Sequence, residues 1–260
     1  NLNADLTKAT SLEINGGYTY ERLNNVSNGN RSEAANQIVA AATAWSPNLP
    51  VIDPVTNDYQ GFVGYGATVR RNPVFQANER DNITNVDILN IGVSLRQKII
   101  DDLSIQASYG LQKRFGDGSN FRRYEPATQG SVSELSTSNN ERTNQQANIQ
   151  IDYDKDFGQH HSLSVVGVAE FLQRENYTYR YINVYNPDNT PGVTVPANDP
   201  FDFTELGQIS FLARANYDYM SKLIITGSVR FDGSSRLPEN NKWDNFYSGA
   251  IAYRISDEKF

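Results

Sequence analysis

Two groups of side chains have the residue types of a metal site. Three aspartates alternate along residues 152–156, and the only histidines of the chain, His160 and His161, follow them. A calcium-binding EF-hand loop needs Gly at its sixth position and Glu at its twelfth, where this chain has Phe157 and Leu163. Adjacent residues of a strand point to opposite faces, so two neighbouring histidines chelate one ion poorly. We therefore expect no metal site and interpret this stretch as a strand that ends in a turn.

Other spacings that would support catalysis or cofactor binding are incomplete. The Gly64-x-Gly66 pair lacks the third glycine and the following helix of a dinucleotide-binding turn. Carboxylates are frequent, and two of them in one cleft would suffice for glycoside hydrolysis. No nucleophile elbow, metal triad or base with an orienting partner accompanies them. The chain also has no cysteine, which excludes disulfides and thiolate chemistry. We expect a protein that is not an enzyme and uses no cofactor.

Charge and hydropathy narrow the class of protein further. The 23 Lys and Arg residues and 30 Asp and Glu residues give a net charge of -7 without a basic cluster, which argues against a nucleic-acid partner. Mean hydropathy is -0.58, yet 11% of the residues are aromatic, which argues against a disordered chain. No apolar run approaches the roughly 18 residues of a membrane-spanning helix. A membrane protein made of alternating strands remains compatible with these values.

The dominant pattern is strict alternation of apolar and polar residues, which is typical of strands with one covered face. Between residues 89 and 95, for example, Leu, Ile, Val and Leu alternate with Asn, Gly and Ser. With their flanks, such segments reach about 12–15 residues, which exceeds the usual strand of soluble sheets and suffices to cross a bilayer. The pattern predicts nine strands, around residues 2–6, 12–20, 89–95, 103–111, 147–153, 163–171, 209–217, 223–231 and 249–255.

The connections between these strands alternate in length. Short turns are expected at residues 7–11, 98–102, 154–161 and 218–222, and long polar connections at residues 24–81, 116–141, 175–204 and 233–242. Short periplasmic turns and long extracellular loops characterise outer-membrane barrels. We therefore expect an all-β, antiparallel up-and-down meander that forms part of a transmembrane β-barrel. The alternative is a non-transporting adhesin or carbohydrate-binding module built as a soluble sandwich, but the polar connections offer no second layer for the apolar faces.

Three further features fit a section of a barrel. Tyrosines near strand ends match the aromatic girdles of membrane barrels, although Tyr is common in strands generally. One short helix is expected at residues 32–45 in the first long loop, ended by Pro47. An odd number of strands leaves two bare edges, whereas bacterial single-chain barrels have even numbers. We expect residues 1–260 to be a part of a larger barrel, not closed and without a signal peptide. The tyrosines are Tyr18, Tyr20, Tyr153, Tyr217, Tyr219 and Tyr253.

The last third of the chain carries motifs of greater specificity. They are Asn216-Tyr217, LIIT at Leu223–Thr226, RFDGSSR at Arg230–Arg236, NKW at Asn241–Trp243 and RIS at Arg254–Ser256. Earlier stretches add WSPNLPV at 45–51, NPV at 72–74 and YDKDFGQHH at 153–161. In this order, and over essentially the whole chain, the motifs resemble the barrel of SusC-like (SusC/RagA) TonB-dependent outer-membrane transporters. Tyr253 stands where that family often has Trp, and Pro238 and Glu239 replace its usual Gly or Lys.

The resemblance implies a 22-strand barrel in the outer membrane of a Gram-negative bacterium. The family's signal peptide, TonB box and plug domain are not part of these 260 residues. Membrane lipid would cover the apolar face of the sheet, and the polar face would line the lumen. The implied function is active import of oligosaccharides or other large nutrients, peptides included. The implied partners are a SusD-like surface lipoprotein and the TonB–ExbB–ExbD complex, which acts through the plug.

Alternation and resemblance together assign candidate functional residues. Arg214, Arg230, Asp232 and Arg254 fall on the polar parity and are expected to face the lumen, where they would hold a plug or line the transport path. Arg230 and Asp232 share a face two residues apart, so we expect them to form an ion pair that rigidifies the wall.

The segment after this pair is expected to leave the sheet. Gly233 would let the strand turn outward, and Ser234 and Ser235 would hydrogen-bond the local backbone. Arg236 would pair with Asp244 across the loop.

The two tryptophans are expected in long loops. Trp45 and Trp243 are therefore candidate contacts for a sugar ring or for the lipoprotein partner, although a loop Trp more often packs within its own loop. The helix predicted at residues 32–45 is a candidate for the same lipoprotein contact.

Overall fold

Nine strands form a single antiparallel sheet in the order β1-β2-β5-β6-β7-β8-β9-β10-β11. The computed structural model describes residues 1–24, 45–60, 62–63, 69–70, 72–123, 132–185 and 191–257, together with residues 38, 42 and 43. Each strand of this sheet pairs with the one before and the one after it along the described chain. The predicted all-β, up-and-down meander of nine strands is therefore confirmed.

The nine strands of the large sheet differ in length almost fivefold, from 6 residues in β1 to 29 in β9. Two short strands, β3 (Phe62–Val63) and β4 (Val69–Arg70), and the helix α2 (Pro73–Asn78) lie in the connection between β2 and β5. The nine strands of the large sheet are β1 (Leu2–Thr7), β2 (Thr10–Asn24), β5 (Arg80–Ile100), β6 (Leu103–Arg122), β7 (Ser133–Phe157), β8 (His161–Tyr185), β9 (Pro191–Tyr219), β10 (Leu223–Ser234) and β11 (Trp243–Tyr253).

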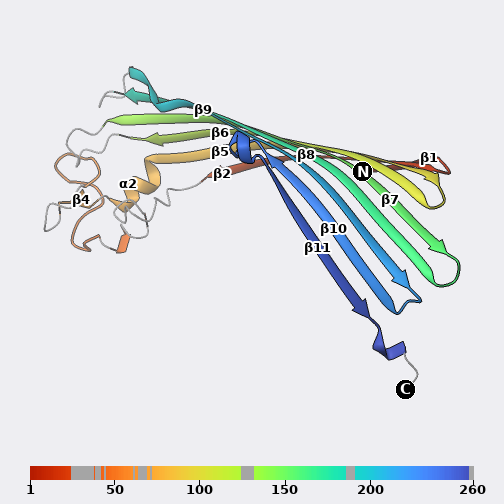
Figure 1. The fold of residues 1–260 in the computed structure, drawn as a ribbon. Helices are drawn as coiled ribbons and strands as arrows, with labels where there is room; N and C mark the ends of the chain where they lie inside the picture. Colours follow the sequence, from red (N-terminus) through yellow and green to blue (C-terminus); the bar gives the residue numbers. More distant parts are fainter. Residues whose placement is uncertain are drawn as a thin grey trace.

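The tight turns and the long connections lie at opposite ends of the sheet. Figure 1 shows the turns at the fanned end of the strands and α2 with β4 at the other end. All four predicted short turns are confirmed, because β1–β2, β5–β6, β7–β8 and β9–β10 are joined by two or three residues. Backbone geometry explains one of them: Met220 and Ser221 have φ of 56° and 57°, and the Lys222 amide donates to the Tyr219 carbonyl at 3.0 Å. Positive φ at both central residues is the hairpin geometry that matches strand twist.

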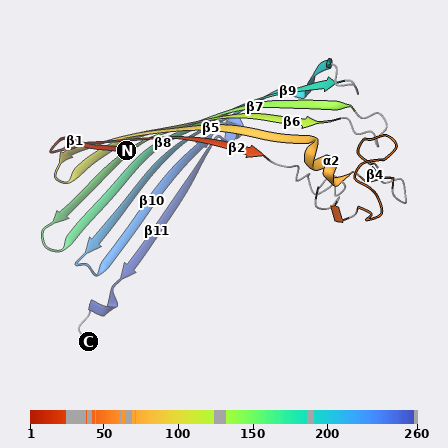
Figure 2. The same ribbon diagram turned by 180° about the vertical axis from the view of Figure 1, so that it is seen from behind.

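The sheet is one layer without a conventional core. Figures 1 and 2 show no element packed across its broad faces. Among the described residues, only Phe75 and Val86 are buried hydrophobic residues. Many large apolar side chains of the strands are exposed instead. The described residues thus supply no second layer of the kind that a soluble sandwich requires.

The connection between β2 and β5 contains a helix that the alternation analysis did not predict. Asn72 caps α2, because its Oδ1 accepts hydrogen bonds from the amides of Val74 and Phe75 at 3.0 and 3.3 Å. Pro73 follows at the first helical position, where the missing N–H costs nothing. The helix predicted at residues 32–45 lies almost entirely outside the described residues. Among the described residues, no helix is long and apolar enough to span a membrane.

The strands extend well beyond the predicted segments. β6 reaches Arg122 and β7 starts at Ser133, so the long connection predicted at residues 116–141 is wrong over most of its length. The same holds for residues 175–204, because β8 runs to Tyr185 and β9 starts at Pro191. In residues 133–141 both faces of β7 are mostly polar, so the apolar alternation that identifies a strand is missing there. On β8 and β9, by contrast, Tyr177, Phe201 and Phe203 alternate with polar residues, and their rings lie 4.6 to 6.5 Å apart on one face. The last strand also differs, since β11 ends at Tyr253 and residues 255–257 form a 3-10 turn.

Candidate functional site: the polar face of the sheet

Register divides the sheet into two chemically distinct faces, because directly paired residues share a face. One row joins Ala169 to Phe211 and Phe211 to Phe231 across β8, β9 and β10. The adjacent row, on the opposite face, joins Glu170 to Ser210 and Ser210 to Asp232. The pattern persists through the half of the sheet next to the turns. One face there is a continuous apolar band and the other is polar.

Aromatic residues mark both edges of the apolar band. At the turn end, the ring of His161 lies 5.0 Å from that of Tyr219 and 6.0 Å from that of Tyr217. At the other edge, the rings of Phe211 and Trp243 stack with centroids 6.3 Å apart. Such belts are typical of residues placed at the two interfaces of a bilayer.

The predicted loop position of Trp243 is wrong. Trp243 is the first residue of β11 and pairs directly with Gly233 of β10. A side-chain Cβ at Gly233 would lie 3.0 Å from the indole ring, so the glycine favours the close approach of Trp243. Trp243 is 56% exposed on the apolar face, a position that suits a membrane interface. Trp45 is half-buried in a bend outside the strands.

The segment from Gly233 to Arg236 differs from its predicted role in three respects. Gly233 and Ser234 still belong to β10, so the strand does not turn out at the glycine. Ser234 Oγ accepts a hydrogen bond from the Arg236 amide at 3.4 Å, which confirms its local backbone contact. Ser235 Oγ instead accepts from the Gly207 amide of β9 at 2.9 Å, and the Ser235 amide donates to the Gly207 carbonyl. No ion pair joins Arg236 to Asp244 among the described residues, so that predicted pair is wrong.

The predicted pair of Arg230 and Asp232 is confirmed. Arg230 Nε lies 2.8 Å from both carboxylate oxygens of Asp232. Its Nη2 lies 3.9 Å from an oxygen of Glu170 on β8. These three side chains, with Asp244 and Phe246 of β11, line a cavity of about 360 Å³ on the polar face. The cluster links β8 to β10 across β9 and holds an excess of negative charge.

The other two arginines of the prediction are placed differently from each other. Arg214 lies on the polar face of β9, where its Nε donates to Asn216 Oδ1 at 3.3 Å. The same oxygen accepts a hydrogen bond from Thr226 Oγ1 of β10 at 2.8 Å. Arg254 lies one residue beyond the end of β11, so it is not part of the strand wall. The structure thus joins Arg230 with Asp232 and keeps Arg214 and Arg254 apart from them.

A ladder of hydrogen-bonded side chains crosses the polar face farther from the turns. Gln112 donates to Asn90, Asn144 donates to Gln112, and Arg174 donates to Asn144, each at 2.9 Å. These four residues stand directly opposite one another on β5, β6, β7 and β8. The sequence analysis missed this ladder, because residues 116–141 were expected to be a long connection and the next strand was expected only from residue 147, so residues 140–146 were not predicted as a strand. The signal was the run of amide side chains at alternate positions of that stretch.

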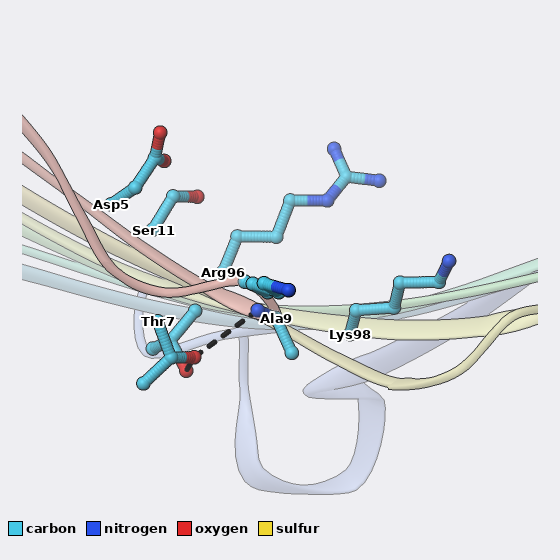
Figure 3. A pocket seen from close by; sticks show the side chains of 8 residues that line it. Asp5, Thr7, Ala9, Ser11, Arg96 and Lys98 are labelled. Atoms are coloured by element: carbon cyan, nitrogen blue, oxygen red, sulfur yellow. Dashed lines mark hydrogen bonds between the residues drawn. The ribbon is translucent and has the colours of Figure 1, made fainter.

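Charges at the turn end are largely paired. Arg96 Nη2 donates to Ser104 Oγ at 3.0 Å and lies 3.8 Å from Asp152. Lys98 Nζ lies 2.7 Å from Asp101, and this contact holds the pKa of the Asp101 carboxyl below its usual value. Figure 3 shows Asp5, Ser11 and Arg96 pointing to one side around a cavity of about 560 Å³ at the β1–β2 turn. Asp5 and Ser11 stand directly opposite each other there.

Metal chemistry has no support in the described residues. No group of three or more His, Asp or Glu lies close enough to hold an ion there. Of the alternating aspartates, Asp152 is a partner of Arg96 at 3.8 Å and accepts from Gln150 at 2.7 Å.

Comparison with known proteins places this two-faced sheet in a family. The sequence profile of the TonB dependent receptor-like β-barrel matches residues 52–258. The chain belongs to this family. TonB-dependent receptors lie in the outer membrane of Gram-negative bacteria, where lipid covers an apolar barrel face. The apolar band and its aromatic edges have the chemistry of such a lipid-facing surface.

Individual TonB-dependent receptors agree with this assignment. TonB-dependent receptor P3 of Formosa agariphila is 24% identical over 275 residues, which cover 100% of this chain and 26% of that protein. TonB-dependent receptor SusC of Bacteroides thetaiotaomicron is 36% identical over 52 residues, or 20% of this chain and 5% of that protein. The predicted resemblance to SusC-like receptors is confirmed. These relatives are named as receptors, not as enzymes.

A solved structure shows the same fold. The RagAB peptide transporter superimposes with a TM-score of 0.75 at 15% identity, covering 98% of this chain and 29% of the matched chain. The BauA ferric preacinetobactin receptor of Acinetobacter baumannii gives a TM-score of 0.52 at 13% identity. The chain therefore spans about a quarter of the length of the receptors that it matches along its full length. That Arg214, Arg230 and Asp232 face the lumen of such a receptor stays a prediction.

Proposed function

We propose that this chain is a section of the barrel wall of an active outer-membrane importer for oligosaccharides or other large nutrients. In the whole protein, a plug would close the barrel and the TonB–ExbB–ExbD complex would open it. A SusD-like lipoprotein would cover the mouth on the cell surface. The family supports nutrient import in general, and the solved RagAB transporter is a peptide importer by name. The oligosaccharide substrate and the lipoprotein partner are our additions.

The observation that carries this proposal is the long and mostly polar face, interrupted by Val166, Val168 and Leu212, which extends from the turn end to the far ends of β6, β7 and β8. Its side chains combine amide, hydroxyl and guanidinium groups, for example in the ladder from Asn90 to Arg174. Amides offer both donors and acceptors, so such a wall can exchange hydrogen bonds with a hydroxyl-rich solute. A soluble sandwich adhesin would instead bury its apolar face under a second sheet, and the described residues supply no such layer.

Uptake by living cells tests the proposed function. The gene of the whole receptor is deleted in its host, and uptake of a fluorescently labelled oligosaccharide mixture is compared with that of the parent strain and of a complemented strain. A second complementing gene lacks the TonB box and serves as the control for energy coupling. We expect uptake to be lost on deletion, restored by the intact gene and not restored without the TonB box. Unchanged uptake in the deletion strain, for peptides as well as oligosaccharides, would contradict an importer.

A further inference from the structure

Three arginines gather on the polar face beyond the apolar band. Arg114 on β6 pairs directly with Arg142 on β7, so their Cβ atoms are about 5 Å apart. Arg142 pairs directly with Asn176 on β8, which makes Arg174, two residues earlier, its diagonal neighbour at about 7–8 Å. Like charges directly opposite each other destabilise a sheet. The arrangement therefore needs a compensating negative group.

No carboxylate of the described residues supplies that compensation. The structure shows no ion pair of Arg114, Arg142 or Arg174 within the described ranges, and Arg174 donates only to the Asn144 amide oxygen, at 2.9 Å. Some other arginines of the sheet are neutralised: Arg230 lies 2.8 Å from Asp232 and Arg122 lies 3.4 Å from Glu134. Arg214 also has only an amide partner among the described residues, Asn216 at 3.3 Å, so the cluster is distinguished by three neighbouring arginines on one face of a chain whose net charge is -7.

The nearest acidic side chains on the same face are not close in register. Glu21 on β2 is two strands from Arg114, in the row that joins it to Val86 and Gly116. Asp202 on β9 pairs with Thr178, four residues along β8 from Arg174. Glu170 lies on the same face of β8, four residues before Arg174, but it accepts from Gln146 at 2.8 Å and lies 3.9 Å from Arg230. None of these acids forms an ion pair with the cluster among the described residues. The positive charge is therefore local and open to a ligand.

The position of the cluster favours a dissolved ligand over lipid. The opposite face at this level carries Lys113, Glu141 and Glu175, and Lys113 lies 3.6 Å from Glu141. Charged rows of this kind lie outside the apolar band. The cluster lies toward the long connections, which are extracellular in outer-membrane barrels. A ligand that enters from the cell surface would meet it early.

Amide side chains surround the arginines and suit hydroxyl groups. Asn140 donates to Asn176 at 3.1 Å and to Thr178 at 2.9 Å, and Asn144 donates to Gln112 at 2.9 Å. Each amide has two N–H donors and two acceptor lone pairs, so these contacts leave capacity for a ligand. Hydroxyl groups next to a negative group are the chemistry of an acidic sugar chain. A peptide offers fewer hydroxyls for the same amides.

We propose that Arg114, Arg142 and Arg174 bind an oxyanion of an oligosaccharide, either a sulfate ester or a carboxylate, while the neighbouring amides bind its hydroxyl groups. This inference rests on the proposed function as an oligosaccharide importer and names the class of its substrate. The guanidinium group is always charged and presents parallel donors to two oxygens of one anion. Two arginines directly opposite each other would both donate hydrogen bonds to one such anion.

Binding to the purified full-length receptor tests the inference. The probes are short end-labelled chains of dextran sulfate, carboxymethyl dextran and unmodified dextran, and the readout is fluorescence anisotropy. The variants are R142Q and the double variant R114Q/R142Q. The control is K113Q, which removes a positive charge one residue away on the opposite face. We expect a charged dextran to bind best, R142Q to weaken it about tenfold and the double variant more, and K113Q to change it less than twofold.

Each outcome decides the proposal. Tighter binding of dextran sulfate assigns a sulfate ester, and tighter binding of carboxymethyl dextran assigns a carboxylate. Equal binding of all three dextrans, no binding, or wild-type affinity in the double variant would overturn the anion site and would indicate neutralisation by another part of the receptor. An acidic peptide that alone binds through the arginines would overturn the oligosaccharide assignment. The cellular uptake assay is independent, because a glycan importer without this site still loses uptake on deletion.

Discussion

Replacement of Arg230 by Gln removes the cation that lies between the carboxylates of Asp232 on β10 and Glu170 on β8. In the wild type, Arg230 Nε is 2.8 Å from both oxygens of Asp232, and its Nη2 is 3.9 Å from Glu170. The variant leaves these carboxylates facing each other across β9 with Asp244 in the next position of the row. We expect the variant to destabilise the barrel through lost attraction and new repulsion.

The magnitude follows from distance and exposure. A hydrogen bond to a charged group contributes about 1.5–3 kcal/mol when it is shielded from water, whereas an exposed ion pair contributes about 0.2–1 kcal/mol. The side chains of Arg230 and Asp232 are 41% and 34% exposed, so solvent screens the pair and about 1 kcal/mol of coupling is expected. Glu170, at 3.9 Å, should couple to Arg230 by only about 0.3 kcal/mol.

A double-mutant cycle measures these couplings directly. The free energy of unfolding is measured by urea titration of the full-length receptor in lipid vesicles, for R230Q, D232N, E170Q and the pairwise combinations. The coupling of Arg230 to Asp232 should fall when salt rises from 0.1 to 1 M, because the screening length shortens from about 10 to 3 Å. A coupling near zero, or a stronger coupling of Arg230 to Glu170, would refute the assignment of the pair as the main contact.

Three further substitutions test other contacts. Gly233→Ala should lower the free energy of unfolding by about 1 kcal/mol, because its Cβ would lie 3.0 Å from the Trp243 ring; Gly227→Ala, with no atom within 4 Å of its Cβ, should be neutral, and equal effects would contradict the close approach. Ser235→Ala should lower the free energy of unfolding by about 1 kcal/mol and speed hydrogen exchange of the Gly207 amide, which donates to the Ser235 hydroxyl. Ser235→Thr should keep that amide protected. Asn72→Ala should cost about 1–2 kcal/mol by removing the cap of α2, seen as faster proteolysis of the β2–β5 connection, whereas Asn72→Asp should retain the cap.

The sequence alone predicted the half of the sheet next to the turns, where one face is the apolar band. Within the apolar band, one face must be hydrophobic and the other is free to be polar, so alternation is strong and the register of β9 with β10 could be anticipated. The turn residues add a second signal, since polar residues such as Asp218 precede each reversal. The pair of Arg230 and Asp232 was predictable for the same reason, because parity alone places both side chains on one face.

The part of the sheet beyond the apolar band gives a weaker signal, limited to alternating aromatic residues of β8 and β9 such as Tyr177 and Phe203. In residues 133–146 of β7, both faces are polar, and neither neighbour nor solvent requires alternation. Backbone pairing with β6 and β8 and side-chain hydrogen bonds such as that from Asn144 to Gln112 hold this part, and neither requires an apolar–polar alternation in the sequence. The predicted loop position of Trp243 was wrong because its position in β11 depends on direct pairing with Gly233 of the neighbouring strand β10. The sequence does contain the signals of a helix start, since Asn72 is a favourable cap and Pro73 a favourable first residue. The sequence analysis did not use them, so α2 was not predicted.

The longest strands extend well beyond the apolar band. The residues of β9 from Ile209 to Tyr219 cover ten steps, or about 33 Å along the strand, and about 25 Å of membrane thickness once the usual tilt is included. The complete strand of 29 residues is more than twice that long. About half of the wall therefore projects beyond the apolar band on the side of the long connections. That half contains the amide ladder and the three-arginine cluster, whereas the pair of Arg230 and Asp232 lies at the level of the band. If the function is import, affinity for the substrate is set outside the membrane, and the part inside the band serves mainly to hold the strands together.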